Sequence, residues 1–194
     1  MGFTDTRFTV NISILFTELP LLERPAAAAA AGFSAVELWW PWVDAPVPEQ
    51  SELDALRDAL NDAGTRLTGL NFYAGQLPGP DRGALSVPGE ESDKFRANID
   101  VAVEFARTMG CKSLNALYGN RVEGVDPQVQ DTLALENLVL AARAADRIGA
   151  TTARTSTRSS TRTRTRPGTC RSPTTPAAAR PAPASWTSPT CSAA

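Results

Sequence analysis

Hydrophobic residues in the first 150 positions follow two alternating patterns: short β-branched apolar runs, and amphipathic stretches with helical spacing. The apolar runs predict strands over residues 7–16, 34–40, 66–73 and 111–119. The amphipathic stretches that follow them predict helices over residues 18–33, 48–64, 91–110 and 126–150. In the second helix, for example, Leu53, Leu56 and Leu60 fall on one face, which we expect to be buried.

Proline and aspartate positions indicate how well these helices begin. Asp126 is a good N-cap for the last helix, and Pro127 then occupies its first helical position. Pro20 fits the first turn of the helix over 18–33, but Pro25 falls in its interior, where a proline costs roughly 3 kcal/mol. The first helix is therefore the least regular of the four.

Four consecutive strand–helix units define the fold class. They predict parallel strands joined by right-handed crossovers, and so an α/β protein. The pattern fits four βα units, which are the N-terminal half of a TIM (βα)8 barrel, or an open doubly wound sheet. No GxGxxG follows the first strand and the chain has no GxxxxGK[ST], which disfavours the nucleotide-binding sheet. We expect residues 1–150 to form a partial TIM-barrel domain.

The composition changes abruptly after residue 150. Residues 1–150 hold all 21 acidic residues and 12 of the 19 basic ones, a net charge of −9. Residues 151–194 hold seven arginines, no acid, and no Leu, Ile, Val, Phe or Met. Such a segment buries too little apolar surface to offset the entropy of ordering it. We therefore expect residues 151–194 to be disordered.

The residue types of this tail share a property of the genetic code. Thr, Ala, Pro, Ser, Arg, Gly, Cys and Trp account for every residue from Thr151 to Ala194, and all have codons with C or G in the middle position. Residue types with A or T in the middle vanish together at one point. A GC-rich gene read out of frame has this effect, because its G- or C-rich third position becomes the middle base. We therefore interpret the tail as out-of-frame translation.

Three segments together resemble bacterial hydroxypyruvate isomerases, a family of the xylose-isomerase-like TIM barrels. They are "NISILFTELPLLERPAAAAAAGFSAVELWWPW" (11–42), "GLNFYAGQLPGPDRGALSVPG" (69–89) and "CKSLNALYGNR" (111–121). The resemblance extends over about residues 7–150 and stops where a fifth strand is due.

The resemblance implies aldose–ketose isomerisation of hydroxypyruvate to tartronate semialdehyde. This chemistry needs a carboxylate that moves a proton and cationic help for the enediolate, commonly a divalent metal in the intact family member. The family takes its Glu, Asp, Glu and His or Gln ligands from the later strands. This chain has no histidine, and its last acidic residue is Asp146. We therefore expect no catalytic residue, no metal site and no cofactor here, and an inactive chain.

Several polar residues fall near the predicted carboxyl ends of the strands, where TIM-barrel sites lie. Asn11, Glu37, Asn71 and Asn115 follow strands one to four in order, and Arg82 lies in the long loop over 74–90. Arginine suits two-pronged contact with a substrate carboxylate. Each residue also has a structural alternative: Glu37 satisfied by neighbouring polar groups, the asparagines bracing loops, and Arg82 locking its own loop.

The remaining expectations concern partners and location. Four units leave strands one and four without outer neighbours, which favours self-association. No apolar run approaches the roughly 20 residues of a membrane span, and the start of the chain lacks a signal-peptide pattern, so we expect a cytoplasmic protein. The alternatives are another sugar isomerase or epimerase of the superfamily, and a non-catalytic half-barrel with a basic nucleic-acid-binding arm. The arm is disfavoured because the tail contains no lysine.

Overall fold

The computed structural model describes residues 8–155 of the chain. Its strands are Val10–Asn11 (β1), Ala35–Leu38 (β2), Arg66–Asn71 (β3), Ser113–Leu117 (β4) and Thr151–Thr155 (β5). Its helices are Arg24–Ala30 (α1), Gln50–Asp62 (α2), Glu90–Thr108 (α3) and Pro127–Asp146 (α4), with a 3-10 turn at Leu21–Glu23 (η1). No helix in this part of the chain is long and apolar enough to cross a membrane.

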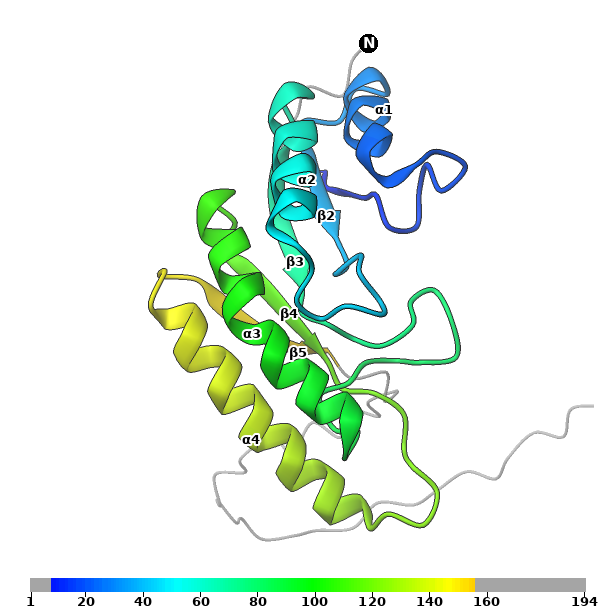
Figure 1. Ribbon diagram of the computed structural model, residues 1–194, viewed down its shortest axis with the longest axis vertical. Helices are drawn as coiled ribbons and strands as arrows, with labels where there is room; N and C mark the ends of the chain where they lie inside the picture. Colours follow the sequence, from blue (N-terminus) through cyan, green and yellow to red (C-terminus); the bar gives the residue numbers. More distant parts are fainter. Residues whose placement is uncertain (1–7, 156–194) are drawn as a thin grey trace, which may run out of the picture. The chain divides into compact units, whose positions relative to one another are not determined.

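The strands form one parallel sheet whose spatial order, β1-β2-β3-β4-β5, is the order in the sequence. In Figure 1, α2 is drawn over β2, α3 is drawn over β4 and β5, and α4 runs alongside α3. A doubly wound sheet instead reverses direction at a switch point, whereas a TIM barrel adds each strand beside the last. The strand order therefore confirms the half-barrel and excludes the doubly wound alternative.

Strand register aligns polar residues across the sheet. Asn11 is paired with Glu37, and Glu37 with Gly69. Further along the sheet, Asn71 is paired with Asn115. The β2–β3 pairing contains a bulge beside Glu37. In-register parallel pairing places these residues at neighbouring positions on adjacent strands.

The core lies between the sheet and the helices. Leu53, Leu56 and Leu60 of α2 are buried, as the spacing predicts. The predicted apolar face of α3 is likewise buried, through Phe95, Ile99, Val103 and Ala106. Asp126 caps α4 by accepting a hydrogen bond from the Gln128 backbone N–H at 2.8 Å. Helical periodicity thus identified the faces that carry the packing.

The first strand is much shorter than the predicted 7–16, because Asn11 begins a turn. Its side-chain oxygen accepts from the Ser13 N–H at 2.8 Å, and its carbonyl accepts from Ile14 and Leu15. Asparagine is prone to this local bonding, which competes with strand pairing. Ile12 is still buried and its N–H donates to the Glu37 carbonyl at 3.1 Å, whereas Ile14 and Leu15 beyond the turn are exposed.

The first helix also begins later than predicted. The segment before it forms the turn η1, and α1 begins at Arg24, so that Pro25 lies in the first turn. A proline there loses no helical hydrogen bond, because the first backbone N–H groups of a helix have no intrahelical acceptor. The predicted strain at Pro25 is therefore absent.

The predicted boundary at residue 150 needs a correction. Thr151–Thr155 form β5, and all five residues pair with β4. Disorder starting at residue 151 is therefore wrong for these five, and among residues 8–155 the outermost strand is β5 and not β4. The rest of the proposed tail, residues 156–194, lies outside the described residues.

The long loop between β3 and α3 returns to β4 at Gly83. Gly83 forms an isolated antiparallel bridge with Tyr118, and the Gly119 N–H donates to the Arg82 carbonyl at 3.1 Å. Gly83 has φ of +126°, and a Cβ placed there would lie 2.1 Å from the Leu117 carbonyl oxygen. Only glycine allows this backbone contact.

We expect Gly83→Ala to lower the free energy of unfolding by about 3 kcal/mol or more, because it adds both an unfavourable φ and a backbone clash. Gly124→Ala is the matched control: φ is +77°, but no atom lies within 4 Å of the added methyl group. We expect the control to lose only about 1 kcal/mol. Urea unfolding followed by circular dichroism measures both values, and equal losses would contradict the close contact.

Candidate functional site

Four of the five predicted site residues lie on β1 to β4, toward the carboxyl ends of the strands, and form two hydrogen-bonded pairs. The Asn11 Nδ2 donates to Glu37 Oε1 at 3.2 Å, and the Asn115 Nδ2 donates to Asn71 Oδ1 at 3.2 Å. We call these four residues the strand-end row. Each hydrogen bond joins two strands that the sheet already pairs, so the row follows directly from the register.

Glu37 has room in the row because its neighbour on β3 is glycine. A Cβ at Gly69 would lie 3.2 Å from the Glu37 Cγ, a tight contact. The Glu37 side chain thus lies over the Gly69 backbone, half-buried. A larger residue at position 69 would push the carboxylate away from Asn11.

The strand-end row consists mainly of neutral groups that form hydrogen bonds. Glu37 is its one carboxylate, and the other three members carry neutral amides. Among residues 8–155, no three His, Cys, Asp or Glu side chains come close enough together to hold a metal ion. Hard divalent cations favour several carboxylate oxygens. The row therefore does not fit the divalent metal that the family resemblance implies.

Arg82 does not join the strand-end row. Its Nη1 donates to the Gly79 carbonyl at 2.7 Å and to the Asp81 carbonyl at 2.9 Å, and its side chain is exposed. These bonds close the loop on itself. Arg82 thus stabilises its own loop, which is the structural alternative given for it above.

A pocket of about 310 Å³ opens beside the row, at the carboxyl ends of β1 and β2. Ser13, Arg24, Trp39 and Trp40 are among its lining residues. The Ser13 hydroxyl accepts from the Trp39 N–H at 2.9 Å, which ties the two strand ends together. Sequence reasoning missed Arg24, because nothing in its local pattern indicates that its side chain folds back to the end of β1.

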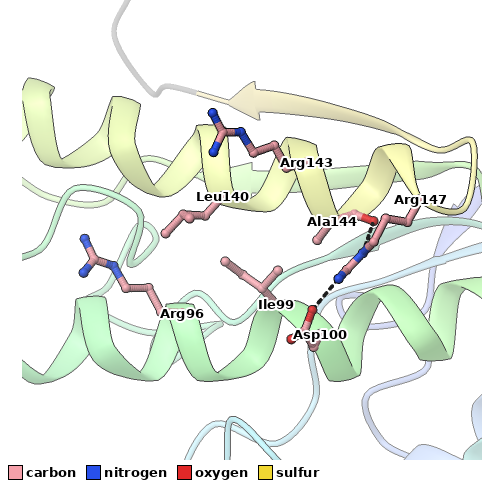
Figure 2. A pocket seen from close by; sticks show the side chains of 7 residues that line it. All are labelled: Arg96, Ile99, Asp100, Leu140, Arg143, Ala144 and Arg147. Carbon is pink, nitrogen blue, oxygen red and sulfur yellow. Dashed lines mark hydrogen bonds and ion pairs between the residues drawn. The ribbon is translucent and has the colours of Figure 1, made fainter.

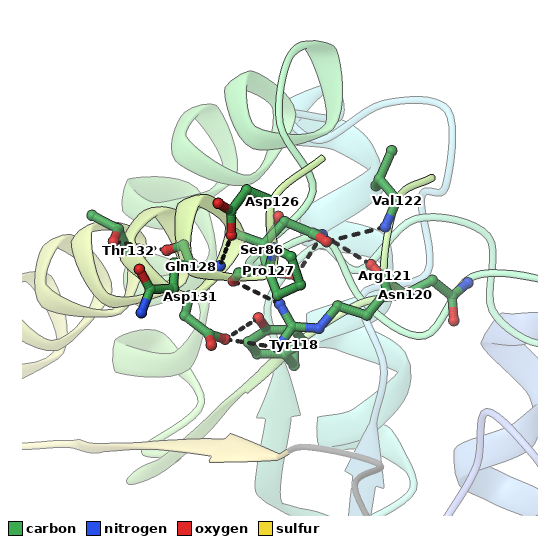
Figure 3. A network of polar contacts seen from close by, with 11 residues as sticks. Ser86, Tyr118, Asn120, Arg121, Val122, Asp126, Pro127, Gln128, Asp131 and Thr132 are labelled. Atoms are coloured by element: carbon green, nitrogen blue, oxygen red, sulfur yellow. Dashed lines mark hydrogen bonds and ion pairs between the residues drawn. The ribbon is translucent and has the colours of Figure 1, made fainter. Parts of the chain in front are cut away.

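Beyond β4, a polar network holds the following loop against α4 (Figure 3). The Tyr118 hydroxyl donates to Asp131, and the Arg121 Nη2 binds the same carboxylate at 3.0 Å. The Arg121 guanidinium also lies over the Tyr118 ring, 5.1 Å from its centroid. This network is a brace: its charges are paired with each other.

Two buried amides of α4, Gln130 and Asn137, hold the loop between β3 and α3. The Gln130 Nε2 donates to the Ser86 carbonyl at 3.1 Å, and the Asn137 Nδ2 donates to the Leu85 carbonyl at 2.9 Å. Sequence reasoning missed both residues. Their signal was available, since two amides seven positions apart occupy the apolar face of a helix.

A second hollow, of about 380 Å³, lies between α3 and α4 (Figure 2). Ile99 and Leu140 lie on its facing walls, and an ion pair at 2.5 Å between Arg147 and Asp100 crosses one end. It belongs to the helical layer and not to the strand ends. We therefore do not assign it to the candidate site.

Parallel strands in chain order, with β1 to β4 each followed by a helix, form one half of a TIM barrel, and active sites of TIM-barrel enzymes lie at the carboxyl ends of the strands. The family model for xylose isomerase-like TIM barrels matches residues 25–153. The chain belongs to this xylose isomerase-like TIM barrel family, as its resemblance to hydroxypyruvate isomerases predicts.

Three individual proteins show what the chain is similar to within and around this family. A Streptomyces coelicolor protein named "Putative hydroxypyruvate isomerase" is 83% identical over 150 residues, which are 77% of this chain and 54% of that protein. A 2-oxo-tetronate isomerase of Haemophilus influenzae is 32% identical over 136 residues, 70% of this chain and 50% of that protein. The crystal structure of an AP endonuclease, family 2, from Brucella melitensis gives a TM-score of 0.63 at 30% identity, covering 77% and 54% of the two chains. The chain thus spans about half the length of the relatives it matches.

The two tyrosines of the chain, Tyr73 and Tyr118, follow β3 and β4 and provide a test of this geometry. Burial, together with the Glu91 carboxylate that accepts from its hydroxyl at 3.1 Å, raises the pKa of Tyr73 from 10.0 to about 12. Burial and the bond to Asp131 raise the pKa of Tyr118 as well.

We therefore expect both tyrosines of the folded chain to ionise at a higher pH than in the unfolded chain, Tyr73 at about 12. Because the folded-state pKa of Tyr73 exceeds the unfolded value, its stabilising effect is complete below pH 10 and disappears as the pH rises through about 12. A near-ultraviolet absorbance titration of tyrosinate measures this. The control is the chain in urea, where both tyrosines should titrate near their ordinary value of about 10. A folded chain that titrates like the control would contradict the buried hydroxyl–carboxylate pairs.

Proposed function

We propose that residues 8–150 come from an enzyme that isomerises hydroxypyruvate to tartronate semialdehyde, and that this chain on its own is inactive. The observation that carries the proposal is the strand-end row, Asn11 with Glu37 and Asn71 with Asn115, at the mouth of half a barrel. The family membership and the names of the relatives support the class of reaction.

The chemistry explains why half a barrel is insufficient. The isomerisation moves a proton from the C3 carbon of hydroxypyruvate to C2, and a hydroxyl proton from O3 to O2, through an enediolate. A positioned base must carry the carbon-bound proton, and a positive charge must stabilise the enediolate. The strand-end row offers one carboxylate, already accepting a hydrogen bond from Asn11. In this proposal Glu37 and the amides bind substrate hydroxyl and carbonyl groups, and the proton-moving carboxylates and any divalent metal belong to the missing half.

The out-of-frame tail accounts for the missing half. Residues 151–194 contain no acidic residue and no histidine, so they supply no base or hard-metal ligand of the type this reaction needs. The loss of all codons with A or T in the middle, at one point in the chain, supports a shift of one base near this position. The match to the family model also ends near this point, at residue 153.

A 2-oxo-tetronate isomerase is the second candidate, because a relative of that name is similar over 136 residues, 70% of this chain. Both names describe isomerases, and a 2-oxo-tetronate has one carbon more than hydroxypyruvate. Residues that contact the additional carbon of the longer substrate would therefore determine which of the two substrates the enzyme prefers. The assay below includes both substrates.

The test compares this 194-residue chain with the product of a gene in which one base is restored near codon 150. We expect the restored chain to convert hydroxypyruvate and this chain to give no turnover, measured by nuclear magnetic resonance of substrate and product. In the restored chain, Glu37→Gln should lower kcat/KM about tenfold, the effect of weakening one charged hydrogen bond. Turnover by the 194-residue chain would overturn its inactivity, and preference of the restored chain for 2-oxo-tetronate would select the second candidate.

We also propose that the chain self-associates through its sheet edges. Within the described residues, β1 pairs only with β2, and β5 only with β4, so each leaves one row of backbone groups unpaired in the sheet. Exposed parallel edges favour pairing with another copy. Sedimentation velocity of the 194-residue chain should show dimers or larger species that increase with concentration. A monomer at every concentration would contradict this proposal.

A further inference from the structure

We infer that the pocket at the carboxyl ends of β1 and β2 binds a small carboxylate through the Arg24 guanidinium and the Trp40 indole. The pocket measures about 310 Å³ and lies beside the strand-end row. The inference concerns binding by this chain, so it stands apart from the catalysis proposed above. Binding here and turnover by a restored chain can fail independently.

The first observation is the charge of the pocket. Arg24 is its one charged lining residue, and no aspartate or glutamate lines it. The half-buried guanidinium donates from Nε to the Leu19 carbonyl at 3.0 Å and from Nη1 to the Ile12 carbonyl at 3.2 Å. Among residues 8–155, no carboxylate forms an ion pair with it. Neutral backbone carbonyls therefore hold the guanidinium in place. Within the described residues, no carboxylate balances its positive charge.

The second observation is an unpartnered donor. Trp40 is 5% exposed, and its Nε1 is buried with no hydrogen-bond acceptor among the described residues. Buried donors are rarely left unsatisfied, because the loss of water without a replacement acceptor is unfavourable. A ligand oxygen that enters beside the ring would give this N–H the acceptor it lacks.

The neighbouring Trp42 shows the contrast. Its ring lies 5.1 Å from that of Trp40, centroid to centroid, yet its Nε1 donates to Glu52 at 3.1 Å. Of these two neighbouring indoles, Trp42 has an acceptor within the protein, and Trp40 has none among the described residues. The unsatisfied indole is the one that lines the pocket.

The rest of the lining combines an apolar part with one more hydrogen-bond donor. Leu77 and Pro78 are its apolar residues from the loop after β3. The Ser13 hydroxyl accepts from Trp39, so its own proton remains to be donated to a ligand. A guanidinium, an indole N–H and a hydroxyl are all donors, and a carboxylate offers only acceptors. A short monocarboxylate with a hydroxyl or oxo group fits this set.

The experiment uses the full 194-residue chain labelled with ¹⁵N and two probes of matched size, glycolate and ethylene glycol. The two differ by a carboxylate in place of a hydroxymethyl group. We expect glycolate to shift the Trp40 indole resonance in proton–nitrogen spectra saturably, and ethylene glycol to leave it unchanged. Equal responses to the two probes, or none to glycolate, would overturn the inference.

Two variants test the role of the indole. Trp40→Phe keeps an aromatic ring and removes the N–H, and we expect it to weaken glycolate binding about tenfold, as for a hydrogen bond to a charged group. Trp42→Phe is the matched control and should bind glycolate like the parent chain, because its N–H is already bonded to Glu52. Equal weakening in both variants would show a packing effect and overturn the assignment to Trp40. If Trp40→Phe does not fold, the comparison of the two probes on the parent chain still decides the matter.

Discussion

The structure depends on the in-register pairing of parallel strands in chain order. Asn11 meets Glu37, and Asn71 meets Asn115, only because each strand lies beside the one before it in one fixed register. Side chains alternate between the two faces of a strand, so a slip of one residue would turn these groups to the other face of the sheet. Leu70 of β3 and Leu114 of β4 are paired and buried, and the same slip would also remove them from their buried positions.

The second source of order is the set of amides that α4 places in the core. The Asn137 Oδ1 accepts from Arg96 Nε at 2.6 Å, and its Nδ2 donates to the Leu85 carbonyl and to the Ser92 hydroxyl. Gln130 similarly joins the loop after β3 to the loop after β4. Fully bonded buried amides fix loop positions more specifically than apolar packing does. The loops at the barrel mouth are thus held by groups within the first half of the fold.

Local sequence patterns predicted the helices and strands, whereas contacts between segments distant in the sequence could be identified only from the structure. Helical spacing located the buried face of α3, and the carboxyl ends of the strands located the row that includes Glu37 and Asn115. The turn at Asn11 was missed because an apolar run continues past it, although the asparagine side chain competes with strand pairing. Arg24 and its pocket were missed because its acceptors, the carbonyls of Ile12 and Leu19, come from an irregular loop that no periodicity describes.

The strand β5 shows that the outermost strand of a parallel sheet can form with few requirements on its side chains. Residues Thr151–Thr155 pair with β4 at all five positions, and parallel pairing uses backbone groups that every residue except proline carries. These five residues include no Leu, Ile, Val or Phe, and they still extend the sheet through their backbone groups. An edge position in a parallel sheet therefore tolerates changes of residue type that an inner strand does not, because an inner strand carries buried side chains on both faces.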